Sequence, residues 1–455
     1  GFTDNNDATS PQLDSQRVLV ALKDLKFQNG RYFLEGPFVK VTDWDAPIKP
    51  VASSADPDSF KFDRSQSGFE DVMVYYFIDS CQRYLQHLGF YGVQNLPIVA
   101  DPHGMNSDDN SAYYPSTNNL SYGEGGVDDA EDVDVILHEY GHAINYGIIP
   151  SWNYSGEQAA LSEGFGDYWA ASYSRKRGYW NSSDPQYSWV FSWDGHNPFW
   201  NGRILNYAPL YPTGITNDIY KDGQMWSTTL MNIWNDIGAE AIDRLVVQSF
   251  YYLASSGVTM TTASQAVIQA DRDLYNGTHL QPIIKWFSQR GFINQYTYLP
   301  RIIHTLLKDN ELVSGSYAVN AEIDPGMAPL DSSSLKVIWG RNGIFSDTSA
   351  LQLTGFPNQY SAIFLGNGQI GTYKYYVVAK DSLNLYSYSP ANAPAEFYFF
   401  YVGPDTIKPI IAHTKINDQI RSNFPLLIKL KATDNIAVDS VWVEFRKQPE
   451  NQIGS

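Results

Sequence analysis

The spacing of hydrophobic residues changes character near residue 298 of the 455-residue chain. Before this point, hydrophobic side chains recur about every three to four residues in several long stretches, which is the period of an α-helix. After it, they alternate with polar side chains in short segments separated by turn residues, which is typical of β-strands. We therefore expect a helix-rich part followed by an all-β part.

The helix-rich part begins with a mixed segment. Short alternating stretches at 31–35, 38–42 and 96–100 predict strands, and a long helical pattern runs over 69–90. Farther along, the pattern predicts a series of helices at 133–144, 159–170, 223–236, 239–255, 261–275 and 282–290. The order predicts an α+β domain with a mixed N-terminal part over 1–137 and a mainly helical part over 138–297.

The pattern of the all-β part predicts a β-sandwich. Its expected strands lie at 302–306, 317–323, 335–339, 360–365, 372–379 and 396–401. Several short strands separated by turn signals indicate an immunoglobulin- or fibronectin-like sandwich module, here over 298–403.

A repeated segment predicts a second module of the same kind. Pro300-Arg-Ile-Ile-His304 recurs as Pro409-Ile-Ile-Ala-His413, and similar strand patterns follow each copy. The second module would start at 404, and Ser455 falls about halfway through it. Half a sandwich leaves its inner face uncovered, so we expect the native protein to continue. His304 and His413 are expected to be structural strand residues.

Composition and charge narrow the possible partners. The chain is 43% hydrophobic and 18% charged, as in globular proteins. A net charge of −18 and a pI of about 4.7 argue against nucleic acid and anionic membranes as partners. No apolar run has the length of a membrane span. Cys81 is the single cysteine, so no internal disulfide can form, and its helical surroundings predict a buried thiol.

The strongest chemical signal is His138-Glu139-Tyr140-Gly141-His142, inside the helical pattern that begins at 133. Residues four apart lie on one face of a helix, so His138 and His142 can hold one metal ion with Glu139 beside it. Two imidazoles and a carboxylate base in this spacing are the signature of zinc proteases. A chance match on a surface helix is the alternative.

The next predicted helix supplies a candidate for the third ligand. Glu163 follows His142 by 21 residues, enough for the chain to leave one helix and return with another. Asp167 lies four residues further, on the same face, where it could orient a ligand imidazole. A solvated acidic face is the alternative. Gly164 and Gly166 weaken a helix, so we expect this helix to pack closely against another element.

A segment before the metal helix is a candidate for substrate binding. Residues 110–125 contain Ser111-Ala112-Tyr113-Tyr114 and predict an extended edge that leads into this helix. Such an edge can pair with a peptide by strand addition. A Tyr-rich loop is the alternative.

Together these residues resemble the thermolysin-like gluzincins, and most closely the fungalysin-like secreted metalloproteases. The resemblance covers roughly residues 65–295, and Glu163-Gly-Phe-Gly-Asp167 is similar to the glutamate-ligand motif of that family. It implies a thermolysin-like zinc protease domain, a Zn²⁺ cofactor, protein or peptide substrates, and secretion.

The resemblance also implies roles for other positions. The backbone of Ala112 would pair with substrate, and Ser111 stands where the family has a substrate-binding asparagine. Tyr154 would stabilise the oxyanion, and Arg203 would bind the substrate carbonyl. Asp134 matches a calcium-binding acidic position of thermolysin, which makes Ca²⁺ a possible second cofactor. Nearby acidic residues add to this expectation, namely Asp128, Asp129, Glu131 and Asp132. A plain acidic loop is the alternative.

One position departs from the family pattern. The family carries a histidine that stabilises the oxyanion in Val-His-x-x-Gly-x-x-Trp, whereas this chain has Tyr220 in Ile219-Tyr-Lys-Asp-Gly-Gln-Met-Trp226. A phenol donates a neutral hydrogen bond but supplies no positive charge. Loss of one oxyanion donor lowers turnover by about 10²–10³. Tyr220 is therefore expected to act with Tyr154 at the oxyanion. The alternatives are that another histidine fills this role or that the enzyme is weak.

Three functions follow as hypotheses. The leading one is a secreted zinc endopeptidase in which Glu139 takes a proton from zinc-bound water and passes it to the leaving nitrogen. A zinc aminopeptidase would need an acidic group for the free amine, for which the sequence has no separate motif. A zinc-binding but catalytically impaired protein would act in binding or adhesion, with the β-modules contacting a surface, glycan or partner.

Overall fold

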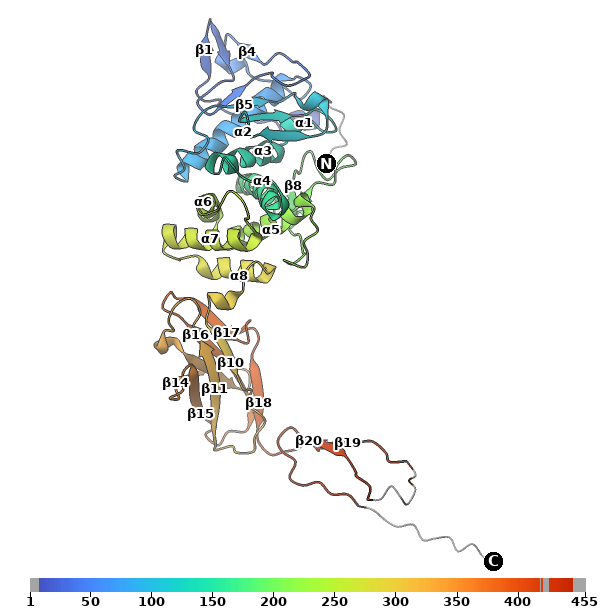
Figure 1. The fold of residues 1–455 in the computed structure, drawn as a ribbon, viewed down its shortest axis with the longest axis vertical. Helices are drawn as coiled ribbons and strands as arrows, with labels where there is room; N and C mark the ends of the chain where they lie inside the picture. The colour runs from blue at the N-terminus through green and yellow to red at the C-terminus, as the bar shows by residue number, and fades with distance from the viewer. Residues whose placement is uncertain (1–7, 418, 420–424, 445–455) are drawn as a thin grey trace, which may run out of the picture. The chain divides into compact units, whose positions relative to one another are not determined.

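A computed structural model describes residues 8–417, 419 and 425–444. The chain forms two compact units, with the division between Gln295 and Tyr296 (Figure 1). Within the described residues, no helix combines the length and apolar character needed to cross a membrane. The fold is a mixture of helices and several sheets, as the sequence predicts.

The first unit opens with two sheets. The smaller sheet contains the short strands β1 (Lys26–Gln28), β2 (Arg31–Phe33) and β4 (Ser53–Ser54). The larger has the order β3-β5-β7-β6, with bounds Val39–Val41, Ile98–Asp101, Asn119–Tyr122 and Ser111–Tyr114. Strands β3, β5 and β7 are parallel, and β6 pairs antiparallel with β7 at one edge. The expected edge segment is therefore the outermost strand of this sheet.

Helices dominate the rest of the first unit, which also contains the two-stranded sheet of β8 (Trp189–Val190) and β9 (Arg203–Ile204). A single turn, α1 (Pro11–Asp14), precedes the sheets, and α2 (Gly68–His87) lies between β4 and β5 in the chain. The remaining helices follow the sheet in order: α3 (Val133–Ile148), α4 (Gly156–Arg177), α5 (Ile219–Ile237), α6 (Ala239–Phe250), α7 (Met260–Tyr275) and α8 (Leu280–Arg290). In Figure 1 the blue strands and α2 occupy one end of this unit, and α5 to α8 occupy the other. Helices α3 and α4 lie between the two halves.

Local sequence fixes the ends of the central helices. Asp132 caps α3 by accepting a hydrogen bond from the backbone N–H of Asp134 at 2.7 Å. Helix α4 ends at Gly178, whose φ of 71° lies in the left-handed region that glycine adopts readily. These caps hold α3 and α4 at fixed lengths beside each other.

The second unit contains two sheets that share one core. One has the order β10-β11-β15-β14, and the other joins β13, β12, β16 and β17, with β18 paired to β16. Their bounds are Arg301–His304, Ser316–Asp324, Gln359–Leu365 and Gln352–Leu353 for the first sheet, and Asp347–Ala350, Lys336–Arg341, Gly371–Lys380, Tyr386–Ser389 and Tyr398–Val402 for the second. Buried residues such as Val319 from β11 and Val377 from β16 belong to one cluster, which makes this part a two-layer β-sandwich.

A short hairpin follows the sandwich. Strands β19 (Ile410–His413) and β20 (Leu430–Thr433) pair antiparallel, as β10 and β11 do. His304 and His413 both lie in strands, and the Nε2 of His304 is 3.3 Å from the hydroxyl of Tyr375. The last part of the predicted second module lies partly outside the described residues. An immunoglobulin- or fibronectin-like identity for these modules stays a prediction.

Candidate metal centre and active site

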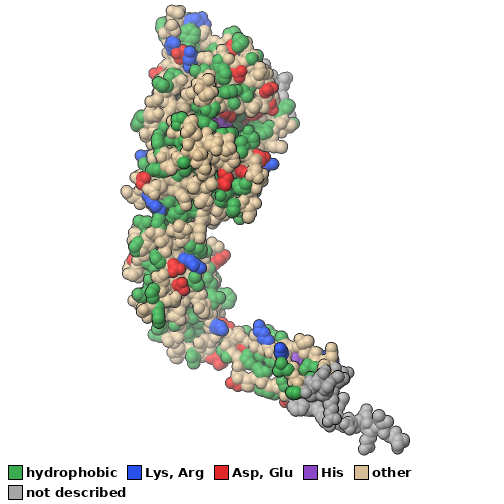
Figure 2. Space-filling view, in the orientation of Figure 1, with side chains coloured by type: hydrophobic (Ala, Val, Ile, Leu, Met, Phe, Trp, Pro, Cys, Tyr) green, Lys and Arg blue, Asp and Glu red, His purple; other side chains and the backbone are tan. Residues whose placement is uncertain are grey.

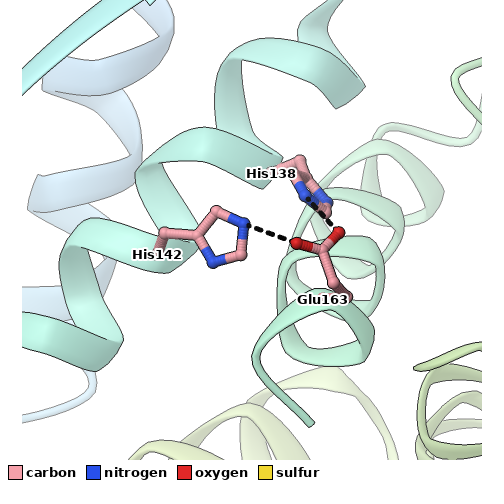
Figure 3. Close-up of side chains that lie close together, drawn as sticks. All are labelled: His138, His142 and Glu163. Atoms are coloured by element: carbon pink, nitrogen blue, oxygen red, sulfur yellow. Dashed lines mark ion pairs between the residues drawn. The ribbon is translucent and has the colours of Figure 1, made fainter. Parts of the chain in front are cut away.

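The two histidines of the zinc-binding motif lie on the same face of α3. The ring centroids of His138 and His142 are 4.8 Å apart, and Glu163 reaches them from α4 (Figure 3). Glycines bring the two helices close enough for this contact. A Cβ at Gly141 would lie 3.0 Å from the Cα of Gly166, and a Cβ at Gly166 would lie 2.6 Å from Nδ1 of His138. The expectation of close packing around the α4 glycines is thus met at Gly166.

Two donor separations around Glu163 match those within a tetrahedral zinc site. Oε2 of Glu163 is 3.4 Å from Nε2 of His138, and Oε1 is 3.4 Å from Nε2 of His142. Ligand atoms about 2.0–2.1 Å from zinc at tetrahedral angles are about 3.4 Å apart. The side chains are buried, with exposures of 3%, 7% and 2% for His138, His142 and Glu163. Two buried imidazoles and one buried carboxylate fit Zn²⁺.

Each histidine has a polar neighbour at its other ring nitrogen. Nδ1 of His138 lies 3.0 Å from Oδ1 of Asp167. Nδ1 of His142 lies 2.9 Å from Oγ of Ser162, whose hydroxyl donates to Oδ1 of Asn145 at 3.1 Å. Because Ser162 donates onward, Nδ1–H of His142 donates to it, which leaves Nε2 as an acceptor for a metal. Sequence reasoning missed Ser162, although it directly precedes Glu163.

Electrostatics favour a charged carboxylate at this centre. Burial alone would raise the pKa of Glu163, but Arg203 and the two histidines lower it well below its usual value. Burial disfavours a charged imidazole, yet Asp167 and Glu163 raise the pKa of His138 to about 9. The carboxylates thus create a strong negative potential where a cation would sit.

Glu139 lies beside the donor set and contacts the edge strand. It is 7% exposed, and its Oε1 accepts a hydrogen bond from Oγ of Ser111 at 3.2 Å. Ser111 is also hydrogen-bonded to Asp129, which is buried next to Asp109 and Asp194. Burial, followed by the charges of Asp194 and Asp109, raises the pKa of Asp129 well above its usual value. The hydroxyl of Ser111 therefore connects Glu139 to the acidic group formed by Asp109, Asp129 and Asp194.

The register of β6 corrects the expected role of Ala112. The N–H of Gly123 donates to the carbonyl of Asn110 at 3.0 Å, and Ala112 is opposite Ser121 two positions further along. Bonded pairs alternate in an antiparallel ladder, so the backbone of Ala112 is directed toward β7. The outward-facing backbone thus belongs to Ser111 and Tyr113, one residue away from the expected Ala112. This offset depends on how β6 pairs with β7, which the sequence motif alone does not determine.

The other predicted catalytic residues surround Glu163. The hydroxyl of Tyr154 donates to Oε1 of Glu163. Nη1 of Arg203 donates to Oε2 of Glu163 at 2.9 Å and to Oδ1 of Asp167 at 2.7 Å. The guanidinium of Arg203 also lies 4.7 Å from the ring centre of Tyr220. Tyr154 and Tyr220 are 43% and 51% exposed, so their phenols border both the buried centre and solvent.

The expected calcium position at Asp134 has a different environment. Its carboxylate accepts hydrogen bonds from the hydroxyl of Ser174 and from the N–H of Phe191, the latter at 3.0 Å. Among the described residues, it belongs to neither of the two all-carboxylate groups that are close enough to hold an ion. Asp134 thus joins α3, α4 and the chain near 191 by hydrogen bonds. The calcium assignment to Asp134 is not supported by this geometry.

Comparison with known proteins relates the chain to metalloproteinases. No protein-family model matches it. It is 22% identical over 236 residues to extracellular metalloproteinase 2 of Trichophyton tonsurans and of Arthroderma benhamiae, and 22% identical over 238 residues to that of Trichophyton rubrum. Each match covers 46% of this chain and 36% of the relative, so the chain spans only about a third of those proteins. The chain is thus similar in sequence to metalloproteinases.

Among solved structures, the precursor of protealysin, a metalloproteinase from Serratia proteamaculans, is similar with a TM-score of 0.45 and 12% identity. That similarity covers 56% of this chain and 85% of the protealysin chain.

Proposed function

We propose that this chain is a zinc-dependent endopeptidase of the thermolysin-like, glutamate-ligand type. The observation that carries the proposal is the donor set of His138, His142 and Glu163, with two 3.4 Å separations and Glu139 beside it. Sequence similarity to metalloproteinases supports the same reaction class. His138, His142 and Glu163 would hold the ion, and Asp167 and Ser162 would keep the imidazoles oriented.

Glu139 is the proposed general base. When bound, Zn²⁺ would polarise a peptide carbonyl and acidify water at neutral pH. Glu139 would take the proton of the attacking water and deliver it to the leaving nitrogen. Ser111 donates to Oε1 of Glu139 at 3.2 Å, which holds the carboxylate in place and leaves Oε2 for the proton.

Tyr154 and Tyr220 are the proposed oxyanion donors. Both phenols lie at the boundary between the buried centre and solvent, where a carbonyl oxygen would enter. Burial raises the pKa of both, and the charge of Glu163 adds to this effect, so both phenols remain protonated at neutral pH. Arg203 lies beside Glu163 and Asp167 and would add positive charge near the carbonyl.

The substrate would bind as an added strand. An extended peptide can pair with the outward backbone groups of Ser111 and Tyr113 at the edge of the larger sheet. Main-chain pairing does not depend on side chains, which suits protein substrates of varied sequence. The extracellular metalloproteinases to which the chain is similar support secretion. The β-modules are proposed to be tandem immunoglobulin- or fibronectin-like spacers.

Glu139→Gln tests the proposal. The amide keeps the size of the side chain but cannot accept the proton, so casein cleavage should fall by about 10²-fold or more while one zinc per chain remains. Glu240→Gln, an exposed change on α6, is the matched control and should leave both unchanged. If Glu139→Gln cleaves casein like the unaltered protein, the assignment is wrong. Zinc without any hydrolysis of unfolded proteins by the unaltered protein would favour the binding or adhesion hypothesis.

The acidic group beside Ser111 favours one alternative, a zinc aminopeptidase. Asp109, Asp129 and Asp194 offer carboxylate oxygens within 4.8 Å of one another, and Asp129 shares Ser111 with Glu139. A protonated amine is a suitable partner for such a group. Peptides with blocked and free N-termini separate the two activities. Cleavage of free N-termini alone would replace the endopeptidase proposal with this one.

A further inference from the structure

A second buried group of carboxylates lies away from the proposed zinc site. Glu70 comes from the first turn of α2, and Asp128 and Glu131 come from the turn that contains η3 (Asp129–Glu131) and leads directly into α3. One oxygen from each lies within 4.8 Å of the others. Their exposures are only 1%, 3% and 6%. Carboxylates are rarely buried together without a cation between them.

Two cationic side chains contact this group or its immediate neighbours. Arg64 donates to both carboxylate oxygens of Glu131, with its Nε at 2.8 Å from Oε1 and its Nη2 at 2.7 Å from Oε2. His103 lies next to Asp71 and Glu124 instead, with Nδ1 2.8 Å from Oε1 of Glu124. Arg64 thus fixes the position of Glu131 within the group.

Glu70 gives a separate indication of a missing ligand. Its Oε1 is completely buried, and no hydrogen-bond partner for it lies among the residues that the structure describes. Burial raises the pKa of Glu70 to about 9, and the charges of Glu131 and Asp128 add to the shift, although His103 opposes it. A buried carboxylate oxygen without a partner is destabilising, so such a group usually has a ligand.

We propose that Glu70, Asp128 and Glu131 bind a calcium ion. All the donors are carboxylate oxygens, which hard cations prefer, whereas zinc prefers nitrogen and sulfur. Magnesium requires a near-octahedral shell and keeps several waters, which a fully buried group cannot supply. Calcium accepts irregular oxygen shells and one- or two-oxygen binding by each carboxylate.

A calcium ion here would connect α2 to the start of the zinc-binding helix. Glu131 directly precedes Asp132, which caps α3, and His138 lies less than two turns further along. The ion would therefore fix the end of α3 from which both histidine ligands follow. The proposal does not depend on peptidase activity, because the ion would stabilise the fold whether or not the chain cleaves peptides.

Calcium binding can be measured on the full chain freed of metal and reloaded with one equivalent of zinc. Calcium at about 100 times its Kd should raise the Tm of the first unit by about 5 °C or more. Terbium is a luminescent substitute for calcium, and Nε1 of Trp193 donates to Oε2 of Glu131 at 3.0 Å. Terbium emission excited through tryptophan should therefore appear, fall on addition of calcium, and decrease in Trp193→Phe.

Glu70→Gln and Asp128→Asn identify the site. Each replacement removes one ligand charge with little change in shape. The calcium affinity and the terbium affinity should therefore each fall at least tenfold, as measured by the rise in Tm and by the terbium emission. If Glu70 is only a protonated carboxylic acid, Glu70→Gln will leave both responses unchanged, which overturns the proposal. Two variants guard against a folding defect in either one.

Asp109→Asn is the matched control, because it alters the acidic group beside Ser111 instead. It should leave the calcium response intact. Loss of the response in Asp109→Asn but not in Glu70→Gln would assign the ion to the other group and overturn the proposal. An unaltered protein whose Tm and terbium emission do not respond to calcium would overturn it as well.

Discussion

Tyr220 is the residue on which the proposed chemistry most depends, because it occupies the position of a histidine in the resembled family. Its neighbour Arg203 offers a reason for a phenol. The guanidinium lies 4.7 Å from the ring centre, where the π-face attracts a cation. A protonated imidazole at the same place would be repelled by Arg203. Compared with a histidine, Tyr220 lacks a positive charge but still provides a hydrogen-bond donor. The neighbouring Arg203 already supplies a positive charge there.

Tyr220→Phe should separate the contribution of the hydroxyl group from that of the ring contact with Arg203. The ring contact with Arg203 remains, while the hydroxyl is lost, so kcat for a peptide substrate should fall by about 10²-fold with little change in KM. Tyr251→Phe, an equally exposed tyrosine on the first unit, should have no effect. An unchanged kcat in Tyr220→Phe would remove Tyr220 from the oxyanion site and leave Tyr154 as the phenolic donor there.

Cys81 illustrates a residue whose environment makes it inert. It is fully buried in α2, and Nε1 of Trp169 donates to its sulfur at 3.0 Å. Burial raises the pKa of the thiol to about 12, so the reactive thiolate is scarce at pH 8. The folded protein should not react with a thiol reagent at pH 8, and one thiol per chain should appear in denaturant. Rapid reaction of the folded protein would contradict this burial.

At the residue scale, the sequence predicts what spacing within a helix determines. His138, His142 and Glu163 follow from such spacing and from a plausible return of the chain, and the structure brings their donor atoms together. Ser162 and the outward backbone of Ser111 do not follow, because one depends on the approach of two helices and the other on strand register. The spacing of hydrophobic residues within one element does not determine which residues of two elements come into contact.

Among the elements, the crossing of α3 and α4 is the one that creates the proposed metal site. Gly166 lets the ring of His138 lie against the backbone of α4, since any Cβ there would come within 2.6 Å of Nδ1. Asp167, the next residue, lies beside the same ring. The glycine is therefore required by the contact even though it weakens the helix by roughly 1 kcal/mol relative to alanine.

Gly166→Ala tests this relation between packing and metal binding. Helix propensity alone would stabilise α4, but the methyl group must displace His138, so zinc affinity should fall by about 10–100-fold. Competition with a chromophoric chelator measures that affinity. The matched change is Gly92→Ala, where an added Cβ meets open space, and it should leave zinc affinity unchanged. Equal zinc affinity in Gly166→Ala and the unaltered protein would contradict the proposed role of this crossing.

The ends of helices and strands are less well predicted by hydrophobic periodicity than their centres. The hydrophobic pattern predicts a helix over 159–170, but α4 runs from Gly156 to Arg177. Its last turn carries Arg175, Lys176 and Arg177, which interact well with the C-terminal end of a helix but add no apolar periodicity. Similarly, β13 (Asp347–Ala350) is largely exposed and carries little hydrophobic signal, so it was not predicted.

At the scale of the whole molecule, two features matter: the distribution of charged side chains and the division of the chain into units. On the face drawn in Figure 2, Lys and Arg side chains are scattered and do not gather into a broad basic patch. The chain divides into two compact units between Gln295 and Tyr296.

The two units should therefore be separable in function. The residues proposed for zinc binding and catalysis lie between Ser111 and Tyr220, inside the first unit, and the calcium ligands proposed above begin at Glu70. A chain ending at Gln295 keeps its own buried core, which includes Ile136, so it should fold by itself. It should bind one zinc per chain, unfold in a single thermal transition, and retain casein cleavage within about threefold of the full chain, because catalysis depends on local geometry.

The same shortened chain carrying Glu139→Gln is the control for contaminating proteases and should be inactive. Casein is an unfolded substrate, so it needs no second binding surface, whereas a folded or surface-bound substrate would. Retained casein cleavage together with slower cleavage of such a substrate would assign the β-modules to substrate capture. Loss of zinc or of cooperative unfolding in the shortened chain would contradict the independence of the first unit, since it would mean that residues after Gln295 stabilise the helices that hold His138 and Glu163.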